Sequence, residues 1–166
     1  MDPIQLRELF DYTYWAFDRV WAAIDRLDDA QFTADLGYSL GSIRNQVLHL
    51  ISGHRRWMCR LQGASLAPHL EFDDFQSRAS VKAEWDQARE ECLRYVGSLT
   101  QADLDQVVPY EIPSRQIEAA SRRSQILIHL VNHSTDHRSQ ILALLNSRLG
   151  IATPEQDFII YLWESK

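Results

Sequence analysis

The chain has 166 residues, of which 45% are hydrophobic and 24% charged, with a formal net charge of −6. This length predicts one globular domain over residues 1–166, and the acidic balance argues against a nucleic-acid-binding surface or an anionic membrane surface. We expect a cytosolic protein, because no apolar run approaches the roughly 20 residues that span a bilayer and the start Met1-Asp2-Pro3 lacks the basic region of a signal peptide.

Hydrophobic periodicity predicts two amphipathic helices in the first part of the chain. The first should run from about Pro3 to Leu27, with Asp2 as its N-cap. The second should run from about Ser42 to Leu61 and end at Gly63. The segment between them, residues 28–41, is expected to be a polar loop.

The second part of the chain predicts two more long helices and a short one. A Ser80 cap should begin the third helix, which reaches about residue 99. The fourth should run from about Arg122 to Arg148 and stop before Gly150, and Pro154 to Trp163 should form a short closing helix. Residues 62–79 and 100–121 are long connections, the latter with a possible extended pair around residues 107–110. The periodicity therefore predicts an all-α four-helix bundle with long crossover loops and a short C-terminal helix.

His133 and His137 lie where the fourth helix should bury aliphatic side chains. Its inward stripe has steps of three and four residues and comprises Ile126, Leu130, His133, His137, Gln140 and Leu144. Histidines four residues apart share one face of a helix, and a buried imidazole without partners is destabilising by roughly 1–3 kcal/mol. A metal ion would compensate both rings at once; the alternative is a pair of core histidines satisfied by hydrogen bonds. We favour the metal.

A third ligand must come from another helix, and the second helix offers His49 and His54. Spacing alone does not choose between them. Gly53 favours His49, since a glycine four residues later would clear space beside that imidazole despite the unfavourable helix propensity of glycine. His54 is otherwise expected at the boundary of the core, and His69, in a loop beside Pro68, at the surface.

Several segments resemble the DinB family, the metal-binding four-helix bundles also grouped with YfiT-type proteins. Residues 130–141, LVNHSTDHRSQI, are similar to the family's HLVNHxxxHRGQI segment. His49 with the following Trp57-Met58-Cys59-Arg60-Leu61 resembles the HxxxxxxxWxxRL pattern, and residues 12–17 and 157–162 resemble the YNxWAN and DFxxYL signatures. The resemblance covers nearly the whole chain and implies an up-down-down-up topology and a homodimer.

The chain departs from the family pattern at a few positions. Ser139 replaces the usual glycine, which could alter packing but not ligation. Thr13 and Phe17 replace two asparagines, so a polar contact is absent or rebuilt. Asp136 is rotated by about 100° from the ligand face and is expected at the surface or behind the ligands. Arg138 is expected to pair with a carboxylate near the surface.

The resemblance implies one divalent ion, Zn²⁺ or Ni²⁺, held by His49, His133 and His137 with an open coordination position. His129 is then a packing residue or lies behind the ligands, and Gln140 could hydrogen-bond a ligand ring or bound water.

The implied function is a metal-dependent thiol transferase or isomerase that uses mycothiol, bacillithiol or glutathione. The alternatives are a metal-dependent hydrolase and a non-enzymatic, stress-associated metal-binding dimer. The sequence assigns no catalytic residue: Cys59 and Cys92 are expected to be buried free thiols rather than nucleophiles.

Overall fold

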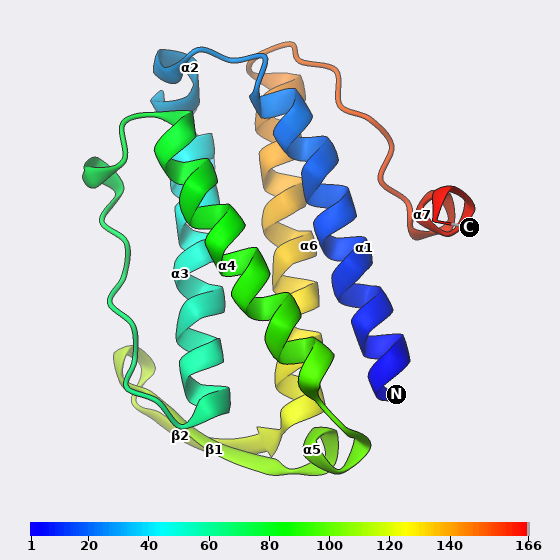
Figure 1. Cartoon of the computed structure of the whole chain (residues 1–166). Coiled ribbons are helices and arrows are strands. Elements are labelled where there is room, and N and C mark those ends of the chain that lie inside the picture. The colour runs from blue at the N-terminus through cyan, green and yellow to red at the C-terminus, as the bar shows by residue number, and fades with distance from the viewer. Residues whose placement is uncertain (166) are drawn as a thin grey trace.

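The computed structural model describes residues 1–165 and shows a bundle of four long helices (Figure 1). They are α1 Pro3–Ile24, α3 Ile43–Gln62, α4 Arg78–Ser98 and α6 Arg123–Ser147. α3 packs against α4 and α6, and α1 packs against the same two helices on the other side. α1 and α6 run in one direction and α3 and α4 in the other, which confirms the up-down-down-up arrangement (Figure 1).

The helix ends follow local capping chemistry, with two corrections, of which the first is that α1 ends at Ile24 rather than at the predicted Leu27. Asp2 forms the expected capping box with Gln5 at the start of α1, and Gly63 ends α3 with a φ of 65°, a conformation that glycine adopts without strain. The predicted Ser80 cap of α4 is wrong. Ser77 is the N-cap and accepts a hydrogen bond from the Ser80 backbone N–H, so α4 begins one turn earlier than expected.

The connections contain more structure than their polar composition predicted. Short helices occupy part of two segments expected to be loops: α2 Asp29–Thr33 and α5 Gln101–Asp105. The extended pair is confirmed as a hairpin of β1 Val107–Ile112 and β2 Ile117–Arg122. Pro109 is tolerated there because both strands of a two-stranded sheet are edges. The closing helix, α7 Phe158–Glu164, is shorter than predicted.

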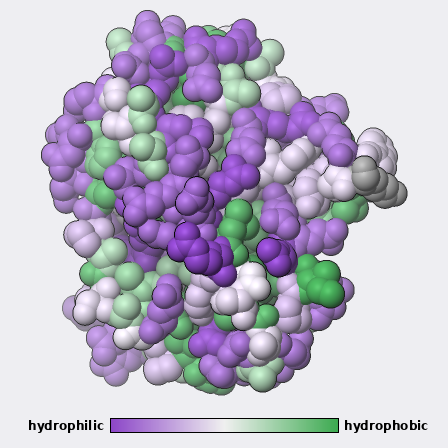
Figure 2. Space-filling model, viewed as in Figure 1, coloured by the Kyte–Doolittle hydropathy of each residue, from purple (hydrophilic) through white to green (hydrophobic). Residues whose placement is uncertain are grey.

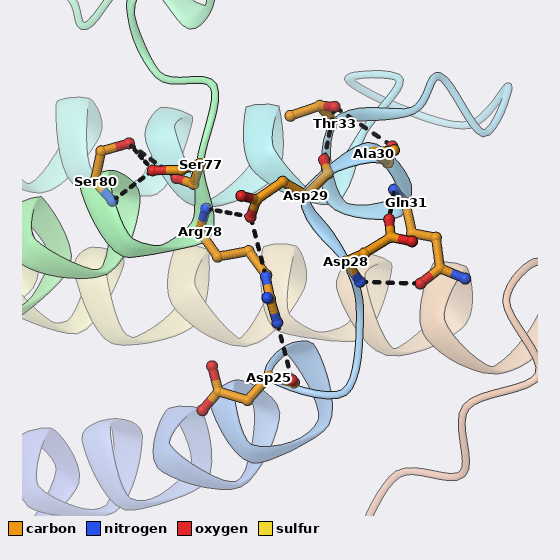
Figure 3. A network of polar contacts seen from close by, with 9 residues as sticks. All are labelled: Asp25, Asp28, Asp29, Ala30, Gln31, Thr33, Ser77, Arg78 and Ser80. Carbon is orange, nitrogen blue, oxygen red and sulfur yellow. Dashed lines mark hydrogen bonds and ion pairs between the residues drawn. The ribbon is translucent and has the colours of Figure 1, made fainter.

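The parallel direction of α3 and α4 requires a connection that returns along the bundle, and residues 63–77, here called the crossover loop, make this return (Figure 1). Its far end is fixed by Arg78, whose backbone N–H and Nε donate to Asp29 Oδ1 while Nη1 donates to the Asp25 carbonyl (Figure 3). The start of α4 is thereby tied to α2 and to the end of α1. This anchoring fixes the path of the crossover loop along α3.

The core is apolar on its α1–α4 side and partly polar between α3 and α6. Buried residues between α1 and α4 include Tyr14, Phe17, Trp85 and Cys92. Hydrophilic residues cover most of the face in Figure 2, with hydrophobic groups in small separate areas. None of the helices in residues 1–165 is both long and apolar enough to cross a membrane.

Candidate metal centre

Three histidines from two helices converge between α3 and α6. His133 and His137 lie one turn apart on α6, with ring centroids 4.5 Å apart. α3 presents His49 to both, at 5.4 Å from His133 and 4.6 Å from His137 between ring centroids. The structure therefore brings together the three residues predicted as ligands, because α3 and α6 are neighbours in the bundle.

The donor atoms of this three-histidine cluster fit a small divalent ion. One ring nitrogen from each histidine can be chosen so that all three lie within 4.8 Å of one another. Three nitrogens bound to a tetrahedral ion at 2.0–2.1 Å would be roughly 3.4 Å apart. Modest rotations of the rings would close the difference, so the cluster could hold a metal ion.

Gln46 determines which nitrogen of His137 is available. Its Oε1 lies 2.7 Å from His137 Nδ1, and an amide oxygen can only accept, so Nδ1 carries the proton and Nε2 keeps its lone pair. Gln46 Nε2 in turn donates to Gln140 Oε1, which also accepts from the Ser39 hydroxyl. Gln46 is fully buried, so this chain of hydrogen bonds fixes the His137 ring in one orientation.

The sequence did not predict the role of Gln46, and of the two contacts expected for Gln140, the hydrogen bond to a ligand ring is absent among residues 1–165. Gln140 acts on Gln46 rather than on a ligand ring within the described part of the chain. A signal was present in the sequence, because Gln46 precedes His49 by three residues and therefore shares its helix face.

Burial keeps the cluster neutral. Burial, followed by the neighbouring rings of His137, His54, His49 and His129, lowers the pKa of His133 to about 3. Burial also lowers the pKa of His49 and of His137, with a smaller contribution from a neighbouring histidine in each case. All three imidazoles are then uncharged at neutral pH, which is the state that binds a metal.

His54, the alternative ligand on α3, belongs to a different environment. It is 3% exposed and its Nε2 lies 2.9 Å from Ser134 Oγ. The Ser134 hydroxyl donates to the Leu130 carbonyl, so it accepts from His54 Nε2–H. His54 is therefore a hydrogen-bonded core histidine, and the expected boundary position is wrong.

The space that Gly53 leaves lies beside His133 rather than beside His49, so the expectation that Gly53 favours His49 is wrong. A Cβ at Gly53 would meet His133 Cε1 at 3.5 Å, an ordinary contact, and no side-chain atom of His49 lies within 4 Å of it. His49 joins the cluster because of its own position on α3. His129 is exposed and packs edge-on against Trp57, 5.4 Å between ring centroids, in agreement with a packing role.

Arg138 corrects another expectation. It is 4% exposed and makes no ion pair within residues 1–165; its Nη2 donates to the Tyr12 hydroxyl and its guanidinium lies 5.2 Å from the Tyr12 ring centroid. Phe17, which stands where the family pattern has an asparagine, lies 6.0 Å below the same guanidinium. Arg138 thus fastens α6 to α1 away from the histidines.

A hollow of about 530 Å³ over α6 is lined by His133 and Asp136. Two further hollows adjoin His49. One, of about 400 Å³, is lined by His49 and His133 and extends along α3 to the hairpin turn. The other, of about 200 Å³, lies between His49, Ser52 and the crossover loop, and includes His69 and Glu71. His69 is exposed, as expected, yet it lines both of the hollows beside His49. Asp136 is exposed, and the three histidines are the only metal-binding group of this kind in residues 1–165.

Known proteins share this fold, and one of them is similar in sequence over nearly the whole chain. The chain is 24% identical over 164 residues to Protein DinB of Bacillus subtilis, a match covering 96% of this chain and 94% of that protein. A conserved protein from Enterococcus faecalis superimposes with a TM-score of 0.70 at 10% identity, covering 90% of this chain and 99% of that one. A DinB-like protein from Bacillus cereus superimposes with a TM-score of 0.58 at 19% identity, covering 89% and 94%. A DinB family member from Shewanella denitrificans gives 0.57 at 16%, covering 95% and 89%.

These structural likenesses establish the fold, and the motifs around His49, His133 and His137 coincide with the three residues that the bundle brings together. The model of the DinB family matches residues 2–166. The chain therefore belongs to the DinB family.

Proposed function

We propose that the protein is a metal-dependent enzyme that transfers or isomerises substrates with the help of a low-molecular-weight thiol. The observation that carries the proposal is the three-histidine cluster, which faces a hollow of about 400 Å³ rather than a fourth protein ligand from residues 1–165. Reactive zinc sites characteristically combine three protein ligands with one open position.

A divalent ion held by the three histidines would lower the pKa of a bound thiol, so that the thiolate, the nucleophilic form, would be available near neutral pH. The chain supplies neutral imidazoles of fixed orientation: His49, His133 and His137 present nitrogen donors, and Gln46 fixes the tautomer of His137. Such donors suit Zn²⁺ or Ni²⁺ rather than Mg²⁺ or Ca²⁺, which prefer oxygen.

The cysteines of the chain do not provide the attacking sulfur. Cys92 is fully buried in the α1–α4 core, and burial raises its pKa to about 11. Cys59, on α3, is half-buried rather than buried as expected, and it does not line any of the hollows beside the histidines. The thiol therefore comes from a small molecule such as mycothiol, bacillithiol or glutathione.

Cobalt substitution tests this proposal. Cobalt-loaded protein should develop a sulfur-to-metal charge-transfer band when one of these thiols is added, and His137→Ala protein should not. The matched control is His69→Ala, which removes a histidine that lines the hollow but is outside the cluster. A cobalt spectrum unchanged by mycothiol, bacillithiol, glutathione and cysteine would contradict the thiol proposal.

Metal-dependent hydrolysis is the second candidate, and one observation favours it. Glu71, an exposed residue of the crossover loop, lines the hollow that His49 and Ser52 also line, and its carboxylate could act there as a general base. Ester hydrolysis that requires the metal and is lost in Glu71→Gln protein would support this reaction. If neither thiol binding nor hydrolysis is found, the non-enzymatic metal-binding alternative gains support.

A further inference from the structure

The hollow beside His49 and His133 is lined by three arginines at its far end. Arg56 and Arg60 come from α3, and Arg115 comes from the turn between β1 and β2. We call this hollow, with its three arginines, the arginine groove. None of the residues that line it is acidic, and none of the three arginines forms an ion pair within residues 1–165. In a chain of net charge −6, this is a local concentration of positive charge, and two glutamates, Glu111 and Glu118, line a neighbouring hollow that Arg60 also lines.

Structural roles use only part of these guanidinium groups. Arg56 donates one hydrogen bond from Nη1 to the Ala67 carbonyl, and Arg60 donates one from Nε to the Glu111 carbonyl. Arg115 makes no hydrogen bond within the described part of the chain. Since a guanidinium carries five N–H donors, most donors of the three groups remain free for a ligand.

A solvated, non-functional set of arginines is the alternative interpretation. Arg60 is in the last turn of α3, where a positive charge favours the helix dipole. That explanation does not apply to Arg115, which belongs to the hairpin turn. Moreover, Arg60 is half-buried over the Trp57 ring, 4.8 Å from its centroid, and burial together with Arg56 lowers the pKa of Arg60. The positive charges of Arg56 and Arg60 are thus held close together, and an anion bound between them would reduce their repulsion.

The spacing of residues along α3 sets the length of a ligand that could place its negative charge at the arginines and its other end at His49. His49, Gly53, Arg56, Trp57 and Arg60 follow each other at helical steps on one face. A rise of 1.5 Å per residue places Arg56 roughly 10 Å beyond His49 along the helix axis. A cavity of about 400 Å³ is within the range of sites for small molecules.

We infer that the arginine groove binds the carboxylates of a thiol ligand of about tripeptide size, or of its thioether product, whose sulfur end lies at the three-histidine cluster. The placement of the sulfur end rests on the proposed function. Carboxylate recognition at the other end rests on Arg56, Arg60 and Arg115 alone. Trp57 and Pro113 form apolar walls for the middle of the ligand.

The direct test uses S-methylglutathione, which has the carboxylates but no free thiol, and its diethyl ester, which lacks the negative charges. Isothermal titration should show that the ester binds zinc-loaded protein about tenfold more weakly than the acid, since hydrogen bonds to charged groups have effects of this size. The Arg60→Met/Arg115→Met double variant should lose about tenfold in affinity for the acid and nothing further for the ester. Equal affinities for acid and ester, or an unchanged double variant, would overturn the inference.

Two controls keep this result interpretable. Arg94→Met removes an exposed arginine of α4 that lines a different hollow, and it should leave the affinity for S-methylglutathione unchanged. The Arg115→Met single variant removes no side-chain hydrogen bond of the described residues, so it should fold normally. Its affinity for S-methylglutathione should fall by a smaller factor than that of the double variant. The far-UV spectrum and the ligand-free cobalt spectrum report whether each variant keeps its fold and its metal site.

Glutathione and cobalt-loaded protein separate this inference from the proposed function. Glutathione could produce no charge-transfer band while tight binding of S-methylglutathione still depends on the arginines. This result would contradict the thiol function and support carboxylate binding in the arginine groove. Glutathione and its diethyl ester could instead produce the band with equal affinity, and the arginine variants could leave that affinity unchanged. This result would contradict carboxylate binding in the arginine groove and support the thiol function.

Discussion

The two halves of the bundle are both well buried, but they differ in chemistry. Between α1 and α4 the interior is aromatic: Trp85 packs against Phe17, with ring centroids 4.5 Å apart, and against Tyr14 at 5.8 Å. Between α3 and α6 the interior contains Gln46, His54 and Ser134, each at most 3% exposed. Burial of apolar side chains between α1 and α4 stabilises the fold, whereas the polar side chains buried between α3 and α6 position the histidines.

The largest expected effect is on the apolar half. Trp85→Ala should lower the free energy of unfolding by about 3–5 kcal/mol, because it leaves a large cavity beside Phe17. Zinc affinity of the folded protein should be unchanged, since Trp85 is on the side of the bundle away from the histidines. Urea unfolding and a zinc competition assay measure the two quantities. A parallel loss of zinc affinity would show that the halves are coupled.

Substitution of the three clustered histidines should have the opposite result, a large loss of metal affinity. Purified protein should contain close to one Zn²⁺ or Ni²⁺ per chain, and His49→Ala, His133→Ala or His137→Ala should each lower the affinity by more than the roughly 100-fold typical of losing a residue behind a ligand. His69→Ala should leave it unchanged. Elemental analysis and competition titration check both statements. Retention of tight binding in His49→Ala but not in His54→Ala would contradict the assignment on α3.

His54 makes the polar half sensitive to acid. Burial, followed by His129 and His137, lowers its folded pKa to about 4, whereas the unfolded value is near 6.5. Between these values the unfolded chain binds more protons, so the contribution of His54 to stability is complete above about pH 6.5 and falls by about 3 kcal/mol as the pH approaches 4. The lowered pKa values of His133, His49 and His137 add to the loss in the same direction. Metal-free protein should show this loss in urea unfolding at pH 7 and pH 4, and His54→Gln should show a smaller one. An equal loss in both proteins would exclude His54 as its source.

Gln46 tests whether the polar half positions the ligands. Gln46→Leu should weaken zinc binding about 10- to 100-fold, because the His137 ring loses the acceptor that fixes its tautomer. Gln46→Glu keeps an oxygen acceptor for His137 Nδ1 at that place, so it should retain a higher zinc affinity than Gln46→Leu. If the two variants bind zinc equally, Gln46 only fills space.

The smallest effect should come from Gly53→Ala. An added Cβ meets His133 Cε1 at an ordinary 3.5 Å, so the gain in helix propensity should stabilise the protein by about 0.5–1 kcal/mol. Thermal unfolding measures the gain, and zinc affinity should be unchanged. Destabilisation would show that the His133 ring has no freedom to adjust.

The sequence predicted the features that depend on local spacing. The four helices and the pair His133 and His137 follow from periodicity along single segments, and the hairpin was visible despite Pro109. The sequence could not predict features that depend on which segments become neighbours. Arg138 meets Tyr12, 126 positions earlier in the chain, and Arg115 reaches the groove only because the hairpin folds beneath α3. The choice between His49 and His54 needed the family pattern, since both lie within one helix.

The crossover loop has a consequence for how such a site can diversify. Leu70 N–H donates to Ser52 Oγ, and Arg56 donates to the Ala67 carbonyl, so the loop lies along the same helix that carries His49. The topology that makes α3 and α4 parallel thus supplies a wall of the site from a segment outside the bundle core. Changes in the length or composition of that wall are inexpensive for folding, because a doubling of loop length costs only about 0.6 kcal/mol. One invariant frame of helices can therefore carry histidines in constant geometry while the adjoining loop selects different ligands.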